Sequence, residues 1–466
     1  MKRILTRSLV LWFVTFAFLG GMVYLSVMTV WHHNEWVQQP FNGHMASANG
    51  LSKAGKIYDR NDKTLAYSEN NERYYSDDET TREALLHVIG DDGLNISTGI
   101  QSRYRTGLSG YNFILGAGVP DSLRPNTDLK LTVDADACTA AYEAMNGKKG
   151  CCVVYNYLTG EVLCDVSAPS FDPADPPEIT EENEDEYDGV YLDNVVSSRF
   201  TPGSVFKIIT AAAAIENVPD IYDQTFTCYG ELDVEGNPIT CEYAHGTQTF
   251  KEAFANSCNC AFAQIATQVG DDKMKETAEK FGFNNDSFKM SEIPIIESHY
   301  DAVGDGDNAL AWSGIGQYTD LANPMLMAMI SSAVANDGTA AAPYIVEDDG
   351  NLIDKLNIAV NKGGDVPMIS ADTASKVKEL MKGSAESYSW RGVSLSGLPF
   401  CAKTGTAEVG EDKEPTAWFV GFIDDMNHPY AFAATVVEGG YGIQAATPVV
   451  EAAISALVNE ELGVRS

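Results

Sequence analysis

An uncharged apolar segment near the N-terminus constrains this chain more than any other feature. It runs from Ser8 to Val30, and about 20 apolar residues in a helix span the hydrocarbon core of a bilayer. Lys2, Arg3 and Arg7 precede it, so the positive-inside rule predicts a cytoplasmic tail, residues 1–7, and an extracytoplasmic remainder. A cleaved signal peptide is the alternative, but its apolar region is typically about 7–15 residues long. We therefore expect a single transmembrane helix, residues 8–30.

The charge balance excludes one class of partner. The chain of 466 residues has a formal net charge of -35, whereas nucleic-acid binding needs clustered lysine and arginine. Many acidic residues fall between Glu178 and Asp193, a segment that we interpret as a solvated loop. A calcium site is the alternative there, but the segment lacks the ligand spacing and the turn glycine of an EF-hand loop.

The nine cysteines are scattered through the chain, unlike the dense, even pattern of a small disulfide-stabilised domain. The stretch from Cys228 to Cys241 reads as two short strands around residues 235–238, which would bring these two thiols close together. A hairpin disulfide and two unpaired thiols are the alternatives. The chain has no CxxC pair and no HExxH motif, and its seven histidines are dispersed, so we expect no metal and no other cofactor.

The extracytoplasmic part changes its pattern at Leu129. Residues 31–128 are polar and carry only short apolar runs, such as Ala84 to Ile89 and Tyr111 to Leu115, which predicts a small membrane-proximal stalk domain. From Leu129 onward the chain shows a strand pattern, a helical pattern over residues 137–147 and two strands around a turn at residues 158–160. We expect one large domain over residues 129–466.

Within the large domain, the alanine-rich segment from Ser204 to Val218 has no polar face, so it predicts a helix buried on all sides. Thr447 and Pro448 have the pattern of an N-cap and a first helical residue, which predicts a C-terminal helix through Leu462. Early strands, a mostly helical middle, consecutive strands and a final helix predict a mixed α/β fold with helices packed on an antiparallel sheet. The consecutive strands are expected at Phe400–Val409, Trp418–Ile423 and Ala431–Glu438.

Three short motifs carry the chemistry, and their order along the chain matters more than any one of them. Each is weak alone, because Ser375 to Lys378 is a second S-x-x-K and residues 47–49 and 68–70 also match S-x-N. Lys-Thr-Gly, however, occurs once. The motifs are Ser204-Val205-Phe206-Lys207, Ser257-Cys258-Asn259 and Lys403-Thr404-Gly405.

Ser204 differs from Ser375 in its context. Pro202 and Gly203 end the preceding segment and place Ser204 at the N-terminus of the buried helix, where unpaired amides and the helix dipole favour negative charge. Lys207 lies one turn further on, and burial lowers the pKa of a lysine so that its neutral amine can accept a proton. We therefore predict Ser204 as a nucleophile and Lys207 as its general base. Lys378 lies in an amphipathic segment, where solvent would keep it charged.

The other two motifs would complete a cleft. Ser257 would relay a proton between Lys207 and a reacting amine, and the Asn259 amide would hold a peptide backbone. The alternative for this pair is a helix boundary whose side chains satisfy backbone groups.

The Lys-Thr-Gly motif follows Pro399, which suits a strand at a sheet edge. Lys403 and the Thr404 hydroxyl would bind a terminal carboxylate, and Gly405 would let another backbone approach closely. The Thr406 amide would join the Ser204 amide as an oxyanion hole. An ordinary surface strand is the alternative.

Taken in this order, the motifs resemble the signatures of the penicillin-binding proteins and serine β-lactamases. The segment IYDRNDKTLAYS from Ile57 is similar to the I-x-D-R-N-G-x-x-L-A string that opens class B penicillin-binding proteins, and strings beginning at Thr159, Arg199 and Ser313 are also similar. Asp62 and Tyr318 depart from the pattern, because glycine is usual at both positions. The resemblance covers nearly the whole chain and favours a short-stalked class B subgroup.

This resemblance implies a peptidoglycan D,D-transpeptidase of the bacterial cell membrane, with a five-stranded antiparallel sheet flanked by helices. It implies that Ser204 attacks the penultimate D-alanyl carbonyl of a peptidoglycan stem peptide, expels D-alanine and passes the acyl group to the amine of a neighbouring strand. β-Lactams would acylate the same serine, and a SEDS-family glycan polymerase is the implied partner. The alternatives are a D,D-carboxypeptidase or β-lactamase-type hydrolase, and a non-catalytic penicillin-binding sensor or scaffold.

Overall fold

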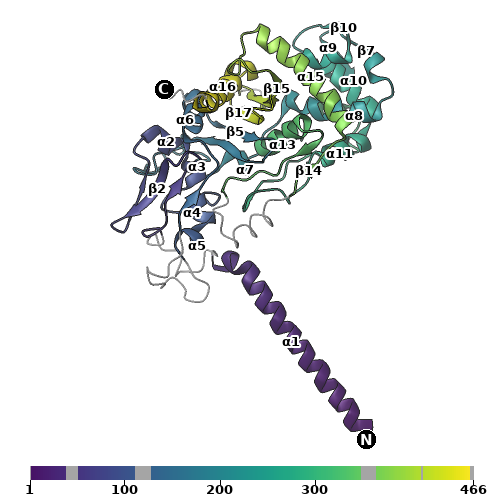
Figure 1. Cartoon of the computed structure of the whole chain (residues 1–466). Coiled ribbons are helices and arrows are strands. Elements are labelled where there is room, and N and C mark those ends of the chain that lie inside the picture. Colours follow the sequence, from purple (N-terminus) through teal and green to yellow (C-terminus); the bar gives the residue numbers. More distant parts are fainter. Residues whose placement is uncertain (1, 38–50, 111–126, 348–363, 411–412, 462–466) are drawn as a thin grey trace.

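The computed structural model describes residues 2–37, 51–110, 127–347, 364–410 and 413–461. The S-x-N match at residues 47–49, the apolar run from Tyr111 to Leu115 and the expected helix end at Leu462 lie outside the described residues. The large α/β region, the smaller membrane-proximal region and the N-terminal helix are visible in Figure 1.

The N-terminal helix α1 (Lys2–Val37) projects away from the rest of the chain (Figure 1). The apolar side chains of residues 9–25 are exposed, and Phe13, for example, is 75% exposed. Within the described part of the chain, Arg7–Thr29 is the one stretch long and apolar enough to cross a membrane. An apolar helix of this length that is not buried in protein fits the predicted single-pass anchor.

A five-stranded sheet forms the centre of the large domain, as predicted. Its strand order is β15-β16-β17-β5-β6, and every neighbouring pair is antiparallel. The strand β15 lies at one edge, and Pro399 precedes it, as expected for a proline that can give no ladder hydrogen bond. The five strands are β5 (Gly150–Asn156), β6 (Val162–Ala168), β15 (Phe400–Ala407), β16 (Thr416–Ile423) and β17 (Tyr430–Val436).

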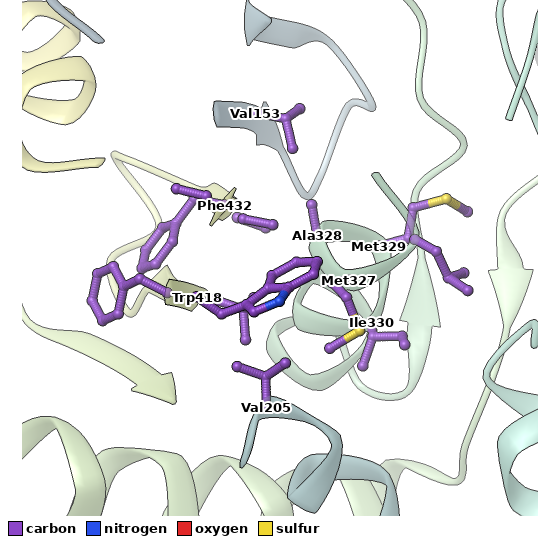
Figure 2. Close-up of a cluster of buried hydrophobic side chains, with 14 of the residues drawn as sticks. Val153, Val205, Met327, Ala328, Met329, Ile330, Trp418 and Phe432 are labelled. Atoms are coloured by element: carbon purple, nitrogen blue, oxygen red, sulfur yellow. The ribbon is translucent and has the colours of Figure 1, made fainter. Parts of the chain in front are cut away.

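Helices cover both faces of this sheet. On one face α6 (Ala135–Met145) and α16 (Gly442–Glu461) pack against each other and against the strands, and α13 (Pro324–Ala335) covers the other face. In Figure 2, Trp418 of β16 and Phe432 of β17 lie against the side chains of α13. Because both faces are covered, every residue of β16 is buried, and the strand reads as a continuous apolar run.

The start of α16 corrects one prediction. The helix begins at Gly442, so the expected N-cap at Thr447 is wrong, and Pro448 lies inside the helix. A Cβ on Gly442 would lie 2.5 Å from the Trp418 carbonyl oxygen and 2.7 Å from that of Gly405. The helix therefore begins where glycine lets the chain cross β15 and β16 closely. Packing against the sheet outweighs the local signal, although Pro448 removes one intrahelical hydrogen bond and its ring crowds the carbonyl of the preceding turn.

The middle of the chain is mostly helical, as predicted, and lies beside the β15 edge. The helix α15 packs against β15, α8 and α9, and it connects this helical region to the sheet (Figure 1). The helices of the region are η3 (Gly203–Phe206), α8 (Lys207–Asn217), η4 (Ile221–Asp223), α9 (Phe250–Ala255), α10 (Asn259–Val269), α11 (Asp271–Lys280), α12 (Asp307–Ser313) and α15 (Ala371–Trp390).

Four two-stranded sheets accompany these helices in the described residues. The predicted hairpin after Cys228 is present as β8 and β9, which pair antiparallel. The acidic segment from Glu178 forms largely exposed turns up to α7 (Asn194–Ser197), as expected for a solvated loop. The paired strands are β7 (Thr225–Cys228) with β10 (Gly246–Thr249), β8 (Glu231–Val234) with β9 (Asn237–Thr240), β11 (Lys289–Met290) with β12 (Ile293–Pro294), and β13 (Thr339–Ala340) with β14 (Val366–Pro367).

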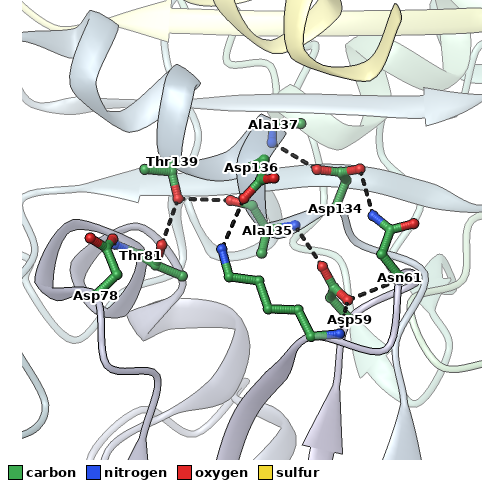
Figure 3. A network of polar contacts seen from close by, with 10 residues as sticks. Asp59, Asn61, Asp78, Thr81, Asp134, Ala135, Asp136, Ala137 and Thr139 are labelled. Carbon is green, nitrogen blue, oxygen red and sulfur yellow. Dashed lines mark hydrogen bonds and ion pairs between the residues drawn. The ribbon is translucent and has the colours of Figure 1, made fainter. Parts of the chain in front are cut away.

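The membrane-proximal residues form a four-stranded sheet with the order β3-β2-β1-β4. Asp59 of the segment that follows β1 accepts hydrogen bonds from the amides of Asn61 and Lys63 at 2.9 and 2.8 Å. Asn61 donates to Asp134, the N-cap of α6, at 3.1 Å (Figure 3). This polar network joins the IYDRNDKTLAYS segment to the N-terminus of α6. The elements are β1 (Ile57–Tyr58), β2 (Thr64–Glu69), β3 (Glu72–Tyr75), α2 (Glu79–Ala84), α3 (Leu86–Ile89), α4 (Ile100–Arg103), α5 (Arg105–Leu108) and β4 (Leu129–Lys130).

The two residues that depart from the family pattern share an unusual backbone conformation. Asp62 and Tyr318 both have a φ of 65°, in the left-handed region that glycine adopts without steric cost. A non-glycine residue there costs about 1–2 kcal/mol, and less for aspartate, whose side chain tolerates this conformation. The chain therefore keeps the turn geometry of the pattern without the glycine.

We predict that Tyr318→Gly raises the free energy of unfolding by about 1 kcal/mol, because it removes left-handed strain. Asp62→Gly should gain less, because it also loses an exposed ion pair with Lys130. Thermal unfolding of the full-length protein in detergent measures both. Tyr318→Phe is the control that removes only the hydroxyl donating to Asp305. Equal or lower stability of Tyr318→Gly relative to Tyr318→Phe would contradict the strain argument.

Candidate active site

Ser204 and Lys207 are held by one turn of 3-10 helix. The predicted buried helix is present, but its first turn, η3, has 3-10 geometry, and α8 begins at Lys207. A 3-10 helix has three residues per turn, so side chains three apart lie directly above one another. The Lys207 Nζ donates to the Ser204 Oγ at 2.9 Å. Lys207 is fully buried, whereas Ser204 is half-buried and can be reached from outside.

The backbone before Ser204 is fixed by neighbours on two sides. The amide of Gly203 donates to the carbonyl of Gly316 at 2.8 Å, and the Trp418 indole N–H donates to the carbonyl of Thr201 at 2.9 Å. Gly203 has a φ of 55°, and a Cβ there would lie 2.9 Å from the Thr406 carbonyl oxygen. This glycine thus brings the start of η3 into close contact with the edge strand β15.

Ser257 and Asn259 lie at the junction of two helices. The amides of Ser257 and Cys258 donate to the carbonyls of Phe254 and Ala253, at 3.0 Å each, which is a Schellman motif ending α9. Ser257 occupies the left-handed position of that motif, with a φ of 53°, where glycine is usual. The pair thus lies at a helix boundary, as the alternative interpretation also expected. The side chains of the pair, however, are directed at Lys207.

The Lys207 amine lies close to more hydrogen-bond acceptors than its neutral form has protons to donate. Its Nζ lies 2.7 Å from the Ser257 carbonyl oxygen and 2.7 Å from the Asn259 Oδ1, and both of these atoms can only accept. A neutral amine with its two N–H groups directed to these oxygens has its lone pair left for a hydroxyl proton. The remaining contacts are the Ser204 Oγ at 2.9 Å and the Ser257 Oγ at 3.2 Å. The geometry therefore permits proton transfer from either hydroxyl to Lys207.

Burial sets the charge state of both lysines of the site. It lowers the pKa of Lys207 well below its usual value, and the nearby Lys403 lowers this pKa further. Burial also lowers the pKa of Lys403 to about 7. Neither lysine forms a salt bridge with a carboxylate of the described residues. A buried lysine without a counter-ion is held close to its neutral form.

Lys403 and Thr404 extend the site along β15. The Lys403 Nζ donates to the Ser257 Oγ at 2.9 Å, so the three motifs form one hydrogen-bonded chain from Ser204 to Lys403. The Thr404 amide donates to the Tyr388 hydroxyl at 3.1 Å instead of to β16. Because strand residues alternate in direction, the Thr406 amide also points away from β16, on the side where η3 approaches.

Gly405 allows the close approach of another backbone segment, as we predicted for a glycine at this position. A Cβ on Gly405 would lie 2.8 Å from the Pro202 carbonyl oxygen. The structure thus brings all eight predicted residues to one place, where β15, η3 and the junction of α9 with α10 meet.

Tyr388 is the residue of the site that the sequence did not reveal. It is buried on α15, and its hydroxyl accepts hydrogen bonds from both the amide and the Oγ1 of Thr404. It lies in the amphipathic segment that also contains Ser375. Its contact with Thr404 depends on how α15 packs on β15, which no local pattern encodes.

The competing motif matches lie elsewhere. Ser375 is exposed, and Lys378 forms an ion pair with Asp424 at the surface. Ser68 donates to the carbonyl of Leu51 in the membrane-proximal sheet. Neither match contributes to the site.

The chain is similar to known proteins over the part that contains the candidate site. Residues 150–455 match the penicillin-binding protein transpeptidase domain. The chain is 31% identical over 369 residues to the peptidoglycan D,D-transpeptidase PbpA of Mycolicibacterium smegmatis, covering 71% of this chain and 72% of that protein. The matched region contains all eight predicted residues.

Solved structures are similar over most of the chain. The penicillin G acyl-enzyme complex of penicillin-binding protein A from M. tuberculosis has a TM-score of 0.73 and 25% identity, and the match covers 87% of this chain and 99% of that one. The D,D-transpeptidase domain of a peptidoglycan glycosyltransferase from Eggerthella lenta has a TM-score of 0.72 and 25% identity. That match covers 89% of this chain and 100% of the other.

The buried charge of Lys403 predicts a pH-dependent stability. Its folded pKa of about 7 lies below the ordinary value of 10.5, so the unfolded chain binds more protons between these limits. The contribution of Lys403 is therefore least favourable below about pH 7 and improves as the pH rises towards 10.5. We expect Lys403→Met to raise the melting temperature most at pH 6, with a gain that shrinks by pH 9. Lys376→Met, at an exposed ion pair, is the matched control. A gain that does not change with pH would rule out this electrostatic origin.

Proposed function

This chain belongs to the family of penicillin-binding protein transpeptidases, and from that premise we propose that Ser204 is the residue on which its acyl-enzyme forms. The activity is that of a peptidoglycan D,D-transpeptidase, which cross-links stem peptides and is acylated by penicillin. One observation carries the assignment of Ser204: its hydroxyl lies 2.9 Å from a buried lysine amine whose two shortest contacts are to oxygens that can only accept hydrogen bonds.

Acylation begins when the Ser204 Oγ attacks the penultimate D-alanyl carbonyl of a stem peptide. The hydroxyl proton passes to Lys207, which is neutral because of its burial. The amides of Ser204 and Thr406 stabilise the oxyanion of the tetrahedral intermediate, an interaction often worth several kcal/mol. The C–N bond then breaks, and the leaving D-alanine amine receives the proton from Lys207 through the Ser257 hydroxyl.

Deacylation reverses these steps with a new amine. The amine of a neighbouring stem peptide attacks the ester carbonyl, and its proton returns through Ser257 and Lys207 to the Ser204 Oγ. Asn259 orients both Lys207 and the incoming peptide: its Oδ1 accepts from Lys207 at 2.7 Å, and its Nδ2, which donates to the Thr240 carbonyl at 3.0 Å, has a second N–H for the peptide. The same atoms thus act as base in one direction and as acid in the other.

The Lys-Thr-Gly strand recognises the carboxylate end of the donor. Lys403 and the Thr404 hydroxyl lie next to Ser257 and bind the terminal carboxylate of D-alanyl-D-alanine, or the carboxylate of a β-lactam that mimics it. A bound anion restores the positive charge on Lys403 that burial opposes. Binding of the carboxylate therefore offsets the unfavourable free energy of a charged, buried Lys403 in the free protein.

We propose the topology on the pattern of charges around the anchor. Lys2, Arg3 and Arg7 place the N-terminal tail in the cytoplasm, and residues 31–128 form a stalk that holds the transpeptidase domain, residues 129–466, on the outer side. A SEDS-family glycan polymerase is the proposed membrane partner, and the membrane helix and the stalk are the segments available for contact with it.

Labelling with a fluorescent penicillin tests the nucleophile. We expect stoichiometric labelling of the full-length protein in detergent and none of Ser204→Ala, while Ser375→Ala labels like the wild type. The adduct should persist for many minutes, because a transpeptidase excludes water from its ester. Labelling of Ser204→Ala would disprove the assignment of the nucleophile. Loss of the adduct within seconds would instead indicate a hydrolase.

A second substitution tests the general base. Lys207→Arg keeps a hydrogen-bond donor but cannot supply a lone pair, because arginine stays protonated. We expect the second-order rate of penicillin acylation to fall by about 10²- to 10⁴-fold, the usual contribution of general acid-base catalysis. Circular dichroism checks that the variant is folded. A folded variant that acylates at the wild-type rate would remove Lys207 from the mechanism.

A further inference from the structure

We propose that Cys228, Cys241, His245 and Cys258 bind one zinc ion, and that this ion braces the segment that carries Ser257 and Asn259. The four ligand atoms, three Sγ and the His245 Nδ1, all lie within 4.8 Å of one another. Three thiolates and one imidazole are a common ligand set for structural zinc. No step of the mechanism uses these four side chains as reactive groups.

The distances within the cluster fit a tetrahedral ion. With Zn–S of about 2.3 Å and Zn–N of about 2.0 Å, the edges of the tetrahedron are about 3.8 Å between sulfurs and about 3.5 Å between sulfur and nitrogen. The Cys241 and Cys258 sulfurs are 3.9 Å apart. The His245 Nδ1 lies 3.4 Å from the Cys241 Sγ and 3.7 Å from the Cys228 Sγ. A disulfide needs an S–S separation of about 2.05 Å, and the Cys241 and Cys258 sulfurs lie well beyond it.

The fold brings together ligands that are far apart in the sequence. Cys228 ends β7, and Cys241 directly follows the β8–β9 hairpin. His245 precedes β10, which pairs with β7, so this pairing returns His245 to Cys228. Cys258 is the last of the four ligands in the sequence and lies between α9 and α10. Because a hairpin, a strand and a helix separate the ligands, no CxxC spacing exists, and our expectation of no metal had no local signal to oppose it.

The surroundings of Cys258 independently favour a sulfur ligand. Cys258 is the N-cap of α10, and its Sγ accepts a hydrogen bond from the Ala261 amide at 3.4 Å. Serine, threonine, aspartate and asparagine are the preferred residues at an N-cap. A thiolate there accepts the amide hydrogen bond well, and such amide contacts orient the sulfur ligands of metal sites. Cys228 and Cys258 are buried and Cys241 and His245 are half-buried, so an ion would be shielded yet accessible.

The cluster is continuous with the candidate active site. Cys258 lies between Ser257 and Asn259, and the Asn259 Nδ2 donates at 3.0 Å to the carbonyl of Thr240, the neighbour of Cys241. Ser257 holds a strained, left-handed backbone, and a metal bond to the adjacent residue would keep it there. This consequence for catalysis rests on the proposed function, whereas the metal site itself does not.

Metal analysis of the full-length protein, purified in detergent after growth with zinc, tests the site. We expect about one zinc per chain by elemental mass spectrometry, and loss of the ion in Cys241→Ser and in His245→Asn, both at half-buried positions. Cys260→Ala is the matched control: Cys260 lies on the same helix but outside the ligand set, with its Sγ 3.8 Å from the Ile239 carbonyl oxygen, and it should retain the ion.

Two results would overturn the proposal. One is a protein with free thiols that takes up no zinc when zinc is supplied. The other is a Cys228–Cys241 or Cys241–Cys258 disulfide in the protein as purified, found by peptide mass spectrometry. Retention of zinc by both Cys241→Ser and His245→Asn would also exclude this ligand set.

Removal of the ion separates the metal site from the proposed function. A displacement of about 1 Å in an active site can cost about 10²-fold in rate, so we expect chelation to slow penicillin acylation at least about tenfold and added zinc to restore it. Ser204→Ala should bind zinc normally and remain unlabelled. A wild type that carries zinc but never reacts with penicillin would refute the proposed function and leave the site standing. Unchanged acylation after complete removal of zinc would refute the brace.

Discussion

The burial of two lysines without a carboxylate is the constraint on which the rest of the site depends. Lys207 and Lys403 are both fully buried in a chain with a net charge of -35, yet no acidic residue of the described part pairs with either. The fold instead surrounds the amines with neutral acceptors, from the carbonyl oxygen of Ser257 to the amide of Asn259. A carboxylate in that place would hold both amines protonated. Much of the acidity of the chain lies instead in exposed segments such as the one from Glu178.

Backbone strain and close approach position these groups. Ser257 occupies the glycine position of a Schellman motif, and Gly203 and Gly405 let η3 and β15 come within contact of each other's carbonyl groups. Strain of this kind costs of order 1–3 kcal/mol and persists only where the surrounding structure enforces it. The contacts that enforce this geometry come from different parts of the domain. They include the hydrogen bond of the Trp418 indole on β16 and those of the helix junction at Cys258. The site is therefore a property of the packed domain and not of any one motif.

Much of this arrangement could be predicted from the sequence, for identifiable reasons. The strands of the sheet and the buried helix from Ser204 have long apolar patterns, and the order of the three motifs carries the resemblance that identifies the fold. The features that were missed depend on contacts between distant segments. The start of α16 at Gly442 is decided by its crossing of the sheet, and the hydroxyl of Tyr388 reaches Thr404 only because α15 packs on β15. The cluster around His245 likewise needs the pairing of β7 with β10.

The position of β15 at the edge of the sheet has a consequence for what the protein can distinguish. An edge strand presents one row of backbone amides and carbonyls to any extended chain that lies alongside it, whatever the side chains of that chain. Here the amides of alternate residues, Thr404 and Thr406, point away from β16, and the Tyr388 hydroxyl of α15 accepts from the Thr404 amide. For the proposed peptide substrate, selectivity then comes from the ends and the chirality of the bound chain and not from its side-chain identity. A template of this kind tolerates chemical variation in the middle of a peptide while remaining strict about its terminus.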